Sequence, residues 1–193
     1  MTSIRSLAVF CGSRVGVNPV YAAAGRVLGD GLGRAGIRLV YGGGRIGIMG
    51  VVADACLEAG GKVLGVIPEF LTQLEVAHER VTEMVVTDTM HTRKRRLYEE
   101  SDAFLIMPGG LGTFDEAFEI ITWRQLGLHE KPIILCNVAG SVGPLVAMIE
   151  HAIDQGFADP NCRRLFEVIE GVPTVLERLK TLPAGARGHA ERL

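Results

Sequence analysis

A glycine-rich segment is the part of this chain best suited to bind an anion. The sequence PGGLGT at Pro108–Thr113 stands between an apolar run and a helix-like run. Glycines at such a turn leave backbone N–H groups free to point at an anion, and the start of the helix adds partial positive charge. We therefore predict a phosphate site at Gly109–Thr113, with a plain tight turn as the alternative.

Two carboxylates follow this segment, and they allow two interpretations. Thr113 and Glu116 fit the T-x-x-E pattern of a capping box, in which each side chain bonds the other's backbone amide, and Asp115 would add favourable charge to the first turn. An acid beside a phosphate is, however, unfavourable for binding alone. It has a purpose if positive charge develops on the ligand, as in the oxocarbenium-like transition state of glycosidic cleavage.

A run of basic residues supplies the second candidate. Within Thr89–Ser101, Arg95 and Arg96 each stand four residues before a glutamate, so solvated ion pairs on a helix explain them. Arg93 and Lys94 lack such partners and share the helix face expected to pack on the sheet. A cation there is costly unless an anion meets it. We predict that Arg93, and with it Lys94, points into a cleft that holds a phosphate or carboxylate; cations snorkelling at the core edge are the alternative.

Alternating apolar and amphipathic runs must position these residues. The short runs are rich in Val, Ile, Leu and Phe, which is typical of strands buried on both faces. Their alternation with helix-length runs predicts a single α/β domain, doubly wound and Rossmann-like, with a mostly parallel sheet of about six to seven strands. The expected strands are Leu7–Phe10, Arg38–Tyr41, Lys62–Ile67, Val81–Val86, Ala103–Met107, Pro132–Cys136 and Phe166–Glu170. The expected helices are Pro19–Ala35, Gly47–Ala59, Thr89–Ser101, Thr113–Leu126, Val142–Gln155 and Pro173–Leu179.

Three loops should meet at one edge of this sheet. In open α/β sheets, ligands bind beyond the carboxyl ends of the strands, and Cys11–Arg14, Gly42–Gly44 and Pro108–Thr113 all follow expected strands. No G-x-x-x-x-G-K-[ST] sequence occurs, which argues against a P-loop NTPase. The first loop also lacks the G-x-G-x-x-G dinucleotide fingerprint.

Composition and charge narrow the class of protein further. A length of 193 residues suggests one domain, expected at 1–182 and followed by a flexible C-terminal tail at 183–193. The formal net charge of −2 provides no basic field to recruit nucleic acid, and no apolar run is long enough to span a membrane. The four cysteines lack metal-ligand spacing, so we expect reduced, packed thiols in a cytoplasmic protein, without metal or cofactor.

Several motifs resemble those of one known family. PGGLGTFDE at Pro108–Glu116, GGGRIGIMG at Gly42–Gly50 and MHTRK at Met90–Lys94 are similar in order and spacing to the LOG (lonely guy) family of cytokinin-activating phosphoribohydrolases. The resemblance covers about Leu7 to Phe157. It implies hydrolysis of the N-glycosidic bond of nucleoside 5'-monophosphates, such as N6-modified AMP (a cytokinin ribotide) or AMP, to free base and D-ribose 5-phosphate. It also implies that Arg93 and Glu116 are catalytic.

The same resemblance implies further site residues and a partner. The implied substrate-binding residues are Ser13, Gly43, Gly44, Glu75, Met90, Lys94, Gly109, Gly110, Leu111, Gly112, Thr113 and Thr122. The short first motif is similar to the dimeric group of the family, so we expect a homodimer, with no nucleic-acid or membrane partner. Family members are often labelled lysine decarboxylases, yet the sequence has no convincing pyridoxal phosphate site. The alternative from another class is a non-catalytic nucleotide carrier or sensor, which would need the glycine loops but not the pair of Arg93 and Glu116.

Overall fold

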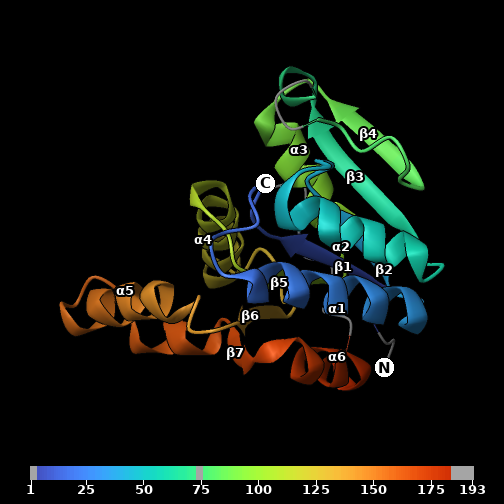
Figure 1. Ribbon diagram of the computed structural model, residues 1–193. Coiled ribbons are helices and arrows are strands. Elements are labelled where there is room, and N and C mark those ends of the chain that lie inside the picture. The colour runs from blue at the N-terminus through green and yellow to red at the C-terminus, as the bar shows by residue number, and fades with distance from the viewer. Residues whose placement is uncertain (1–3, 73–75, 184–193) are drawn as a thin grey trace.

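Seven parallel strands form the centre of the molecule, and helices cover both faces (Figure 1). The computed structural model describes residues 4–72 and 76–183. The strands are β1 (Ser6–Phe10), β2 (Arg38–Tyr41), β3 (Val63–Pro68), β4 (Glu83–Thr87), β5 (Ala103–Ile106), β6 (Ile133–Asn137) and β7 (Glu167–Glu170). The helices are α1 (Pro19–Ala35), α2 (Gly47–Glu58), α3 (Met90–Glu99), α4 (Leu111–Gln125), α5 (Gly143–Asp154) and α6 (Gly171–Thr181), with short 3-10 turns η1 (Glu69–Leu71) and η2 (Pro160–Arg164).

The doubly wound α/β fold predicted from the sequence is confirmed. Helix α1 has the predicted bounds because its ends carry strong signals. Asn18 caps the start by accepting a hydrogen bond from the amide of Val20, Pro19 takes the first helical position, and Gly36 ends the helix with a φ of 67°. Most other bounds differ from the predicted ones by one or two residues. The predicted tail lies outside the described residues from position 184 on.

The strand order β4-β3-β2-β1-β5-β6-β7 places the functional loops. Strand β1 pairs with β2 on one side and with β5 on the other. The helix after β1 packs into the core on one face of the sheet, together with α2 and α6. The helix after β5 packs into the core on the opposite face, together with α3 and α5. The loops that follow β1 and β5 therefore diverge, which leaves a crevice of the kind that binds ligands in such sheets.

Helices α1 and α2 lie unusually close together. Gly25, Gly29 and Gly33 recur every fourth residue of α1, so they share the face that meets α2. A Cβ added at Gly29 would collide with the carbonyl oxygen of Val52, and one added at Gly33 would lie 2.7 Å from the carbonyl oxygen of Cys56. Only glycine allows this approach of two backbones. Of the helices formed by residues 4–72 and 76–183, none is both long and apolar enough to cross a membrane.

Candidate active site

Arg93 is a buried cation that points into the crevice from α3. It is 6% exposed, and its Nε donates a hydrogen bond of 3.1 Å to the carbonyl oxygen of Val66 in β3. Its Nη1 lies 3.4 Å from Oε1 of Glu116. Arg93 therefore lies on the packed face of its helix and meets a carboxylate of the chain there. That it also meets an anionic ligand in the cleft stays a prediction.

Glu116 lies in the second turn of α4, and its side chain is 12% exposed. The capping-box interpretation of Thr113 and Glu116 is wrong, because the helix begins at Leu111, two residues earlier than predicted. Gly110 takes the N-cap position and makes no side-chain cap. For the same reason Asp115 does not lie in the first turn. The carboxylate of Glu116 lies near Arg93, from the second turn of the helix.

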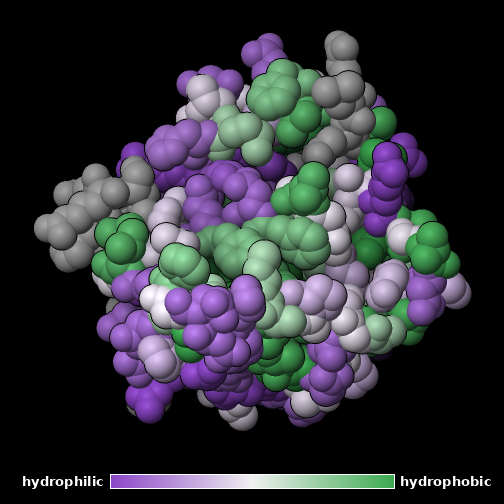
Figure 2. Space-filling view, turned by 90° about the vertical axis from the view of Figure 1, so that its left-hand side faces the viewer, coloured by the Kyte–Doolittle hydropathy of each residue, from purple (hydrophilic) through white to green (hydrophobic). Residues whose placement is uncertain are grey.

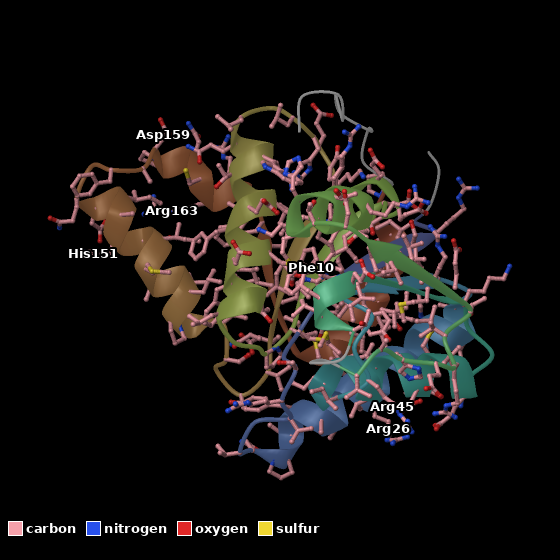
Figure 3. The ribbon with its side chains drawn as sticks, turned by 90° about the horizontal axis from the view of Figure 1, so that it is seen from above. Phe10, Arg26, Arg45, His151, Asp159 and Arg163 are labelled. Atoms are coloured by element: carbon pink, nitrogen blue, oxygen red, sulfur yellow. The ribbon has the colours of Figure 1, made fainter. Side chains whose placement is uncertain are left out.

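The pair opens into a small cavity of about 130 Å³. Residues from four different elements surround it, which explains why no single stretch of sequence contains the site. Its walls are Cys11, Gly12 and Ser13 after β1, Met49 of α2, Arg93 of α3, and Gly110, Leu111, Gly112, Thr113 and Glu116 around the start of α4. Seen from above, Phe10, whose strand leads into this site, lies near the centre of the molecule, whereas His151 lies on the outlying α5 (Figure 3).

The glycines at the start of α4 divide into two kinds. A Cβ added at Gly109 would collide with the hydroxyl of the buried Thr113, so this glycine serves packing. At Gly110 and Gly112 an added Cβ would meet no atom within 4 Å. These two glycines border open space beside the first amides of the helix, where an anion binds most readily. The predicted phosphate site therefore has open space beside it, although its role stays a prediction.

Cys11 brings a thiol to the same cavity. Burial, and next the negative charge of Glu116, raise the pKa of Cys11 well above its usual value. The thiol is consequently protonated at neutral pH and adds no charge beside the pair. Among residues 4–72 and 76–183, no group of three or more His, Cys, Asp or Glu side chains is placed to hold a metal ion.

Lys94 turns away from the cavity that Arg93 enters. Its Nζ lies 2.8 Å from Oδ2 of Asp115 and 3.3 Å from Oε1 of Glu119. The ion pairs predicted for the next two arginines are present, at 2.9 Å between Arg95 and Glu99 and at 2.8 Å between Arg96 and Glu100. The cations of α3 therefore serve different purposes, and only Arg93 reaches the cavity.

Four further predicted binding residues, Gly43, Gly44, Met90 and Thr122, do not line this cavity. Gly43 packs against Ile67 and Met84, and Gly44 pairs with Ala77 in an isolated bridge. Met90 begins α3 and is half-buried, while Thr122 is exposed on the fourth turn of α4. Glu75 lies outside the described residues. The binding roles of all these residues stay predictions.

Gly42 belongs to one of the loops expected at the ligand-binding edge, but its own role at Arg93 was not predicted. A Cβ at this position would collide with Nη2 of Arg93, so a glycine is needed for the guanidinium to occupy its place. Met49 and Gly12 were missed as well, although both line the cavity. The repeated glycines of Gly42–Gly44 gave a signal, but it could not tell which of them contacts the arginine across the sheet.

Known proteins resemble this chain over most of its length. Residues 49–179 match a family model described as possible lysine decarboxylase. A probable cytokinin riboside 5'-monophosphate phosphoribohydrolase of Oryza sativa subsp. japonica is 42% identical over 96% of this chain and 82% of its own length. A cytokinin riboside 5'-monophosphate phosphoribohydrolase of Rhodococcoides fascians is 42% identical over 92% of this chain and 90% of its own.

Solved structures share the fold at lower sequence identity. The molybdenum cofactor binding protein from Rippkaea orientalis superimposes with a TM-score of 0.69 at 21% identity, over 94% of this chain and 98% of its own. The molybdenum cofactor carrier protein from Chlamydomonas reinhardtii gives a TM-score of 0.66 at 20% identity, over 91% of this chain and 95% of its own. At such identities the likeness establishes the architecture alone.

Proposed function

The chain belongs to the family of cytokinin riboside 5'-monophosphate phosphoribohydrolases, and from this premise we propose how its site works and what it cleaves. The reaction is hydrolysis of the N-glycosidic bond of a nucleoside 5'-monophosphate to free base and D-ribose 5-phosphate. We propose N6-modified AMP and AMP itself as substrates. The observation that carries this proposal is the buried contact of Arg93 with Glu116 beside the open start of α4.

The helix start provides the place for the 5'-phosphate. The first amides of α4 have no side-chain cap, and the space beside Gly110 and Gly112 is open. An anion bound there gains from the free N–H groups and from the helix dipole. A ribose attached to that phosphate then extends into the small cavity, toward Glu116. We propose that Ser13 and Thr113, which line the same cavity, help to hold this part of the nucleotide.

In this mechanism Glu116 acts on the ribose and Arg93 acts on the leaving base. As the bond from C1' to the base breaks, positive charge develops on the ribose, and the nearby carboxylate of Glu116 stabilises it. The same carboxylate orients the water whose oxygen bonds to C1'. Arg93 stabilises the electron pair that stays on the leaving base. A guanidinium is a poor acid, so the proton reaches the base through an ordered water.

The base must lie beyond the small cavity, because 130 Å³ is well below the ~300–1,000 Å³ of typical ligand pockets. We propose that Met90, Lys94, Thr122, Glu75, Gly43 and Gly44 contribute to its surroundings, as the family resemblance implies. A neighbouring subunit could complete the enclosure.

A homodimer is part of the proposal. Figure 2 views the molecule from the side of α4 and α5, and apolar side chains gather across the middle of this face. Exposed apolar residues of these helices include Leu111 at 86%, Phe114 at 37% and Met148 at 54%. Exposed apolar patches of this kind mark interaction sites. We also propose a cytoplasmic location, which the four free and buried cysteines support.

Chromatography of reaction products tests the activity. The purified protein is incubated with isopentenyladenosine 5'-monophosphate, AMP, GMP or CMP, beside the Glu116→Gln and Arg93→Ala variants. Free base should appear with the unmodified protein alone, while circular dichroism shows that both variants are folded. Absence of free base from every nucleotide, together with a thermal shift by AMP, would favour a nucleotide carrier instead.

Light scattering after size exclusion tests the dimer. The protein should elute at twice its chain mass of 20.7 kDa, and Phe114→Glu should shift it toward the monomer because a buried, unpaired charge opposes association. The control is Glu177→Lys on α6, a larger charge change on the opposite face of the sheet. A monomeric protein, or equal effects of both variants, would contradict the proposed interface.

A further inference from the structure

A second and larger cavity adjoins the first. Its volume is about 780 Å³, six times that of the cavity at Arg93 and Glu116. Both cavities share Gly12, Ser13, Gly110 and Leu111 as walls. The larger one then extends away from the pair, toward the loop after β6, where Ala139 and Gly140 both have positive φ angles. The assigned chemistry uses none of this space.

The surroundings of the larger cavity favour negative charge. Of the residues at positions 4–72 and 76–183, no carboxylate lines it, whereas Arg14 and the hydroxyls of Ser13 and Ser141 do. It also receives first-turn residues from four helices, namely Tyr21, Ile48, Leu111 and Pro144. None of these helices has an acidic residue in its first turn, and α2, α4 and α5 have no side-chain N-cap bond. Their free amides and partial charges add to the charge of Arg14.

Part of the lining is apolar, and the volume exceeds what a phosphate needs. Val15, Tyr21 and Ile48 contribute carbon surface, and Tyr21 stacks its ring over Gly16, whose added Cβ would lie 2.9 Å from it. The volume falls within the ~300–1,000 Å³ of pockets that hold a whole small molecule. An occupant should therefore combine an anionic part with a sugar or an aromatic ring.

We propose that this cavity receives the part of a nucleotide that extends beyond its 5'-phosphate, so that the site binds nucleoside 5'-diphosphates and their sugar esters. The inference rests on the proposed function, since it takes the α-phosphate to lie at the wall of Gly110 and Leu111 with its ribose toward Glu116. A second phosphate bonded to that α-phosphate leads away from the pair and into the larger cavity. There it meets Arg14, and a group esterified to it reaches the apolar wall.

Calorimetric titration with AMP, ADP and ADP-ribose tests this proposal. The full-length Glu116→Gln variant is used so that no ligand is cleaved during the measurement. Affinity should rise from AMP to ADP, because the second phosphate gains the charge of Arg14. It should rise again to ADP-ribose if the apolar wall takes the esterified sugar; ADP-ribose binding no better than ADP would restrict the cavity to the diphosphate itself and overturn the assignment of sugar esters.

Arg14→Ala, added to the same protein, isolates the larger cavity. Loss of a charge-assisted bond to phosphate should weaken the affinity for ADP and ADP-ribose about tenfold or more. The affinity for AMP should stay within about twofold. Arg26→Ala is the matched control. Arg26 is an exposed arginine of α1 that pairs with Glu58 at 3.3 Å, and it lies well away from Phe10 in Figure 3. A second variant, Val15→Glu, places a carboxylate at the cavity and should weaken the two diphosphates without affecting AMP.

The outcomes separate this inference from the proposed function. Equal affinities for the three nucleotides, or equal losses for AMP and ADP in Arg14→Ala, would overturn the inference even if the unmodified protein releases base from AMP. If the predicted order of affinities and its dependence on Arg14 are found but no base is released from any monophosphate, the ligand assignment of the cavity stands and the hydrolase assignment fails.

Discussion

Two of the ion pairs that join α3 and α4 have completely different surroundings. Arg93 and Glu116 meet in a cavity, and both are nearly buried. Lys94 and Asp115, their immediate neighbours in sequence, meet on the outer side, where Asp115 is 58% exposed. Both pairs consist of a basic residue of α3 and an acidic residue of α4, so residue type and spacing do not distinguish them. What distinguishes them is the helix face, because a shift of one residue turns a side chain by about 100° around the helix.

Neutralising the two carboxylates should separate the pairs most clearly. Glu116→Gln should lower kcat for AMP hydrolysis by about 100- to 10,000-fold, the range typical of a group that acts in the transition state. The kcat of Asp115→Asn should stay within about twofold of the unmodified protein's. Its free energy of unfolding should fall by no more than ~1 kcal/mol, as for other exposed pairs. Steady-state kinetics and urea denaturation of both variants check this. Similar losses in the two variants would remove the functional distinction between inner and outer pair.

Gly42→Ala should give the next largest effect, without altering either charge. The added methyl group would collide with Nη2 of Arg93 and push the guanidinium off its place. A displacement of about 1 Å can cost about 100-fold in rate. We expect kcat to fall about 10- to 100-fold while the circular dichroism spectrum is retained. Gly143→Ala is the control, because its Cβ would meet no atom within 4 Å. Unchanged kcat in Gly42→Ala would show that the position of Arg93 is not critical.

Lys94→Ala should have the smallest effect on catalysis, and it tests the difference between the inner pair of Arg93 with Glu116 and the outer pair of Lys94 with Asp115. Lys94 faces Asp115 and Glu119 rather than the reacting groups, although the family resemblance makes it a binding residue. Loss of a contact made equally in ground and transition state raises KM and leaves kcat unchanged. We expect KM for AMP to rise about three- to tenfold by that reasoning. A fall in kcat comparable to that of Glu116→Gln would place Lys94 among the catalytic groups instead.

The sequence predicted the scaffold better than the details of the site. Continuous apolar runs and strong helix signals, such as Asn18, Pro19 and Gly36, are local features, so strands and helices were found close to their true bounds. The burial of Arg93 was also predictable, because helical periodicity places it on the packed face. These predictions depend only on residues that are near each other along the chain.

The incorrect or missing predictions at the site also share a physical cause. Thr113 and Glu116 fit a capping box locally, but Gly110 competes for the N-cap position and the helix starts there. Local sequence does not show which of two possible caps is used. The role of Gly42 and the existence of the larger cavity depend on segments that meet only after folding, from β1, β2, β5 and β6. No spacing along the chain reveals such meetings.

The close contact of α1 with α2 has a consequence for motion. With Gly29 seated against the backbone of Val52, the two helices can neither slide nor rotate past one another without losing that fit. Both begin at the larger cavity, so their first turns keep a fixed separation as the protein fluctuates. Amide hydrogens along this helix pair should exchange with solvent only through large-scale opening of the domain. Any closure around a bound nucleotide must then come from the loops or from the opposite layer, where α4 and α5 lie.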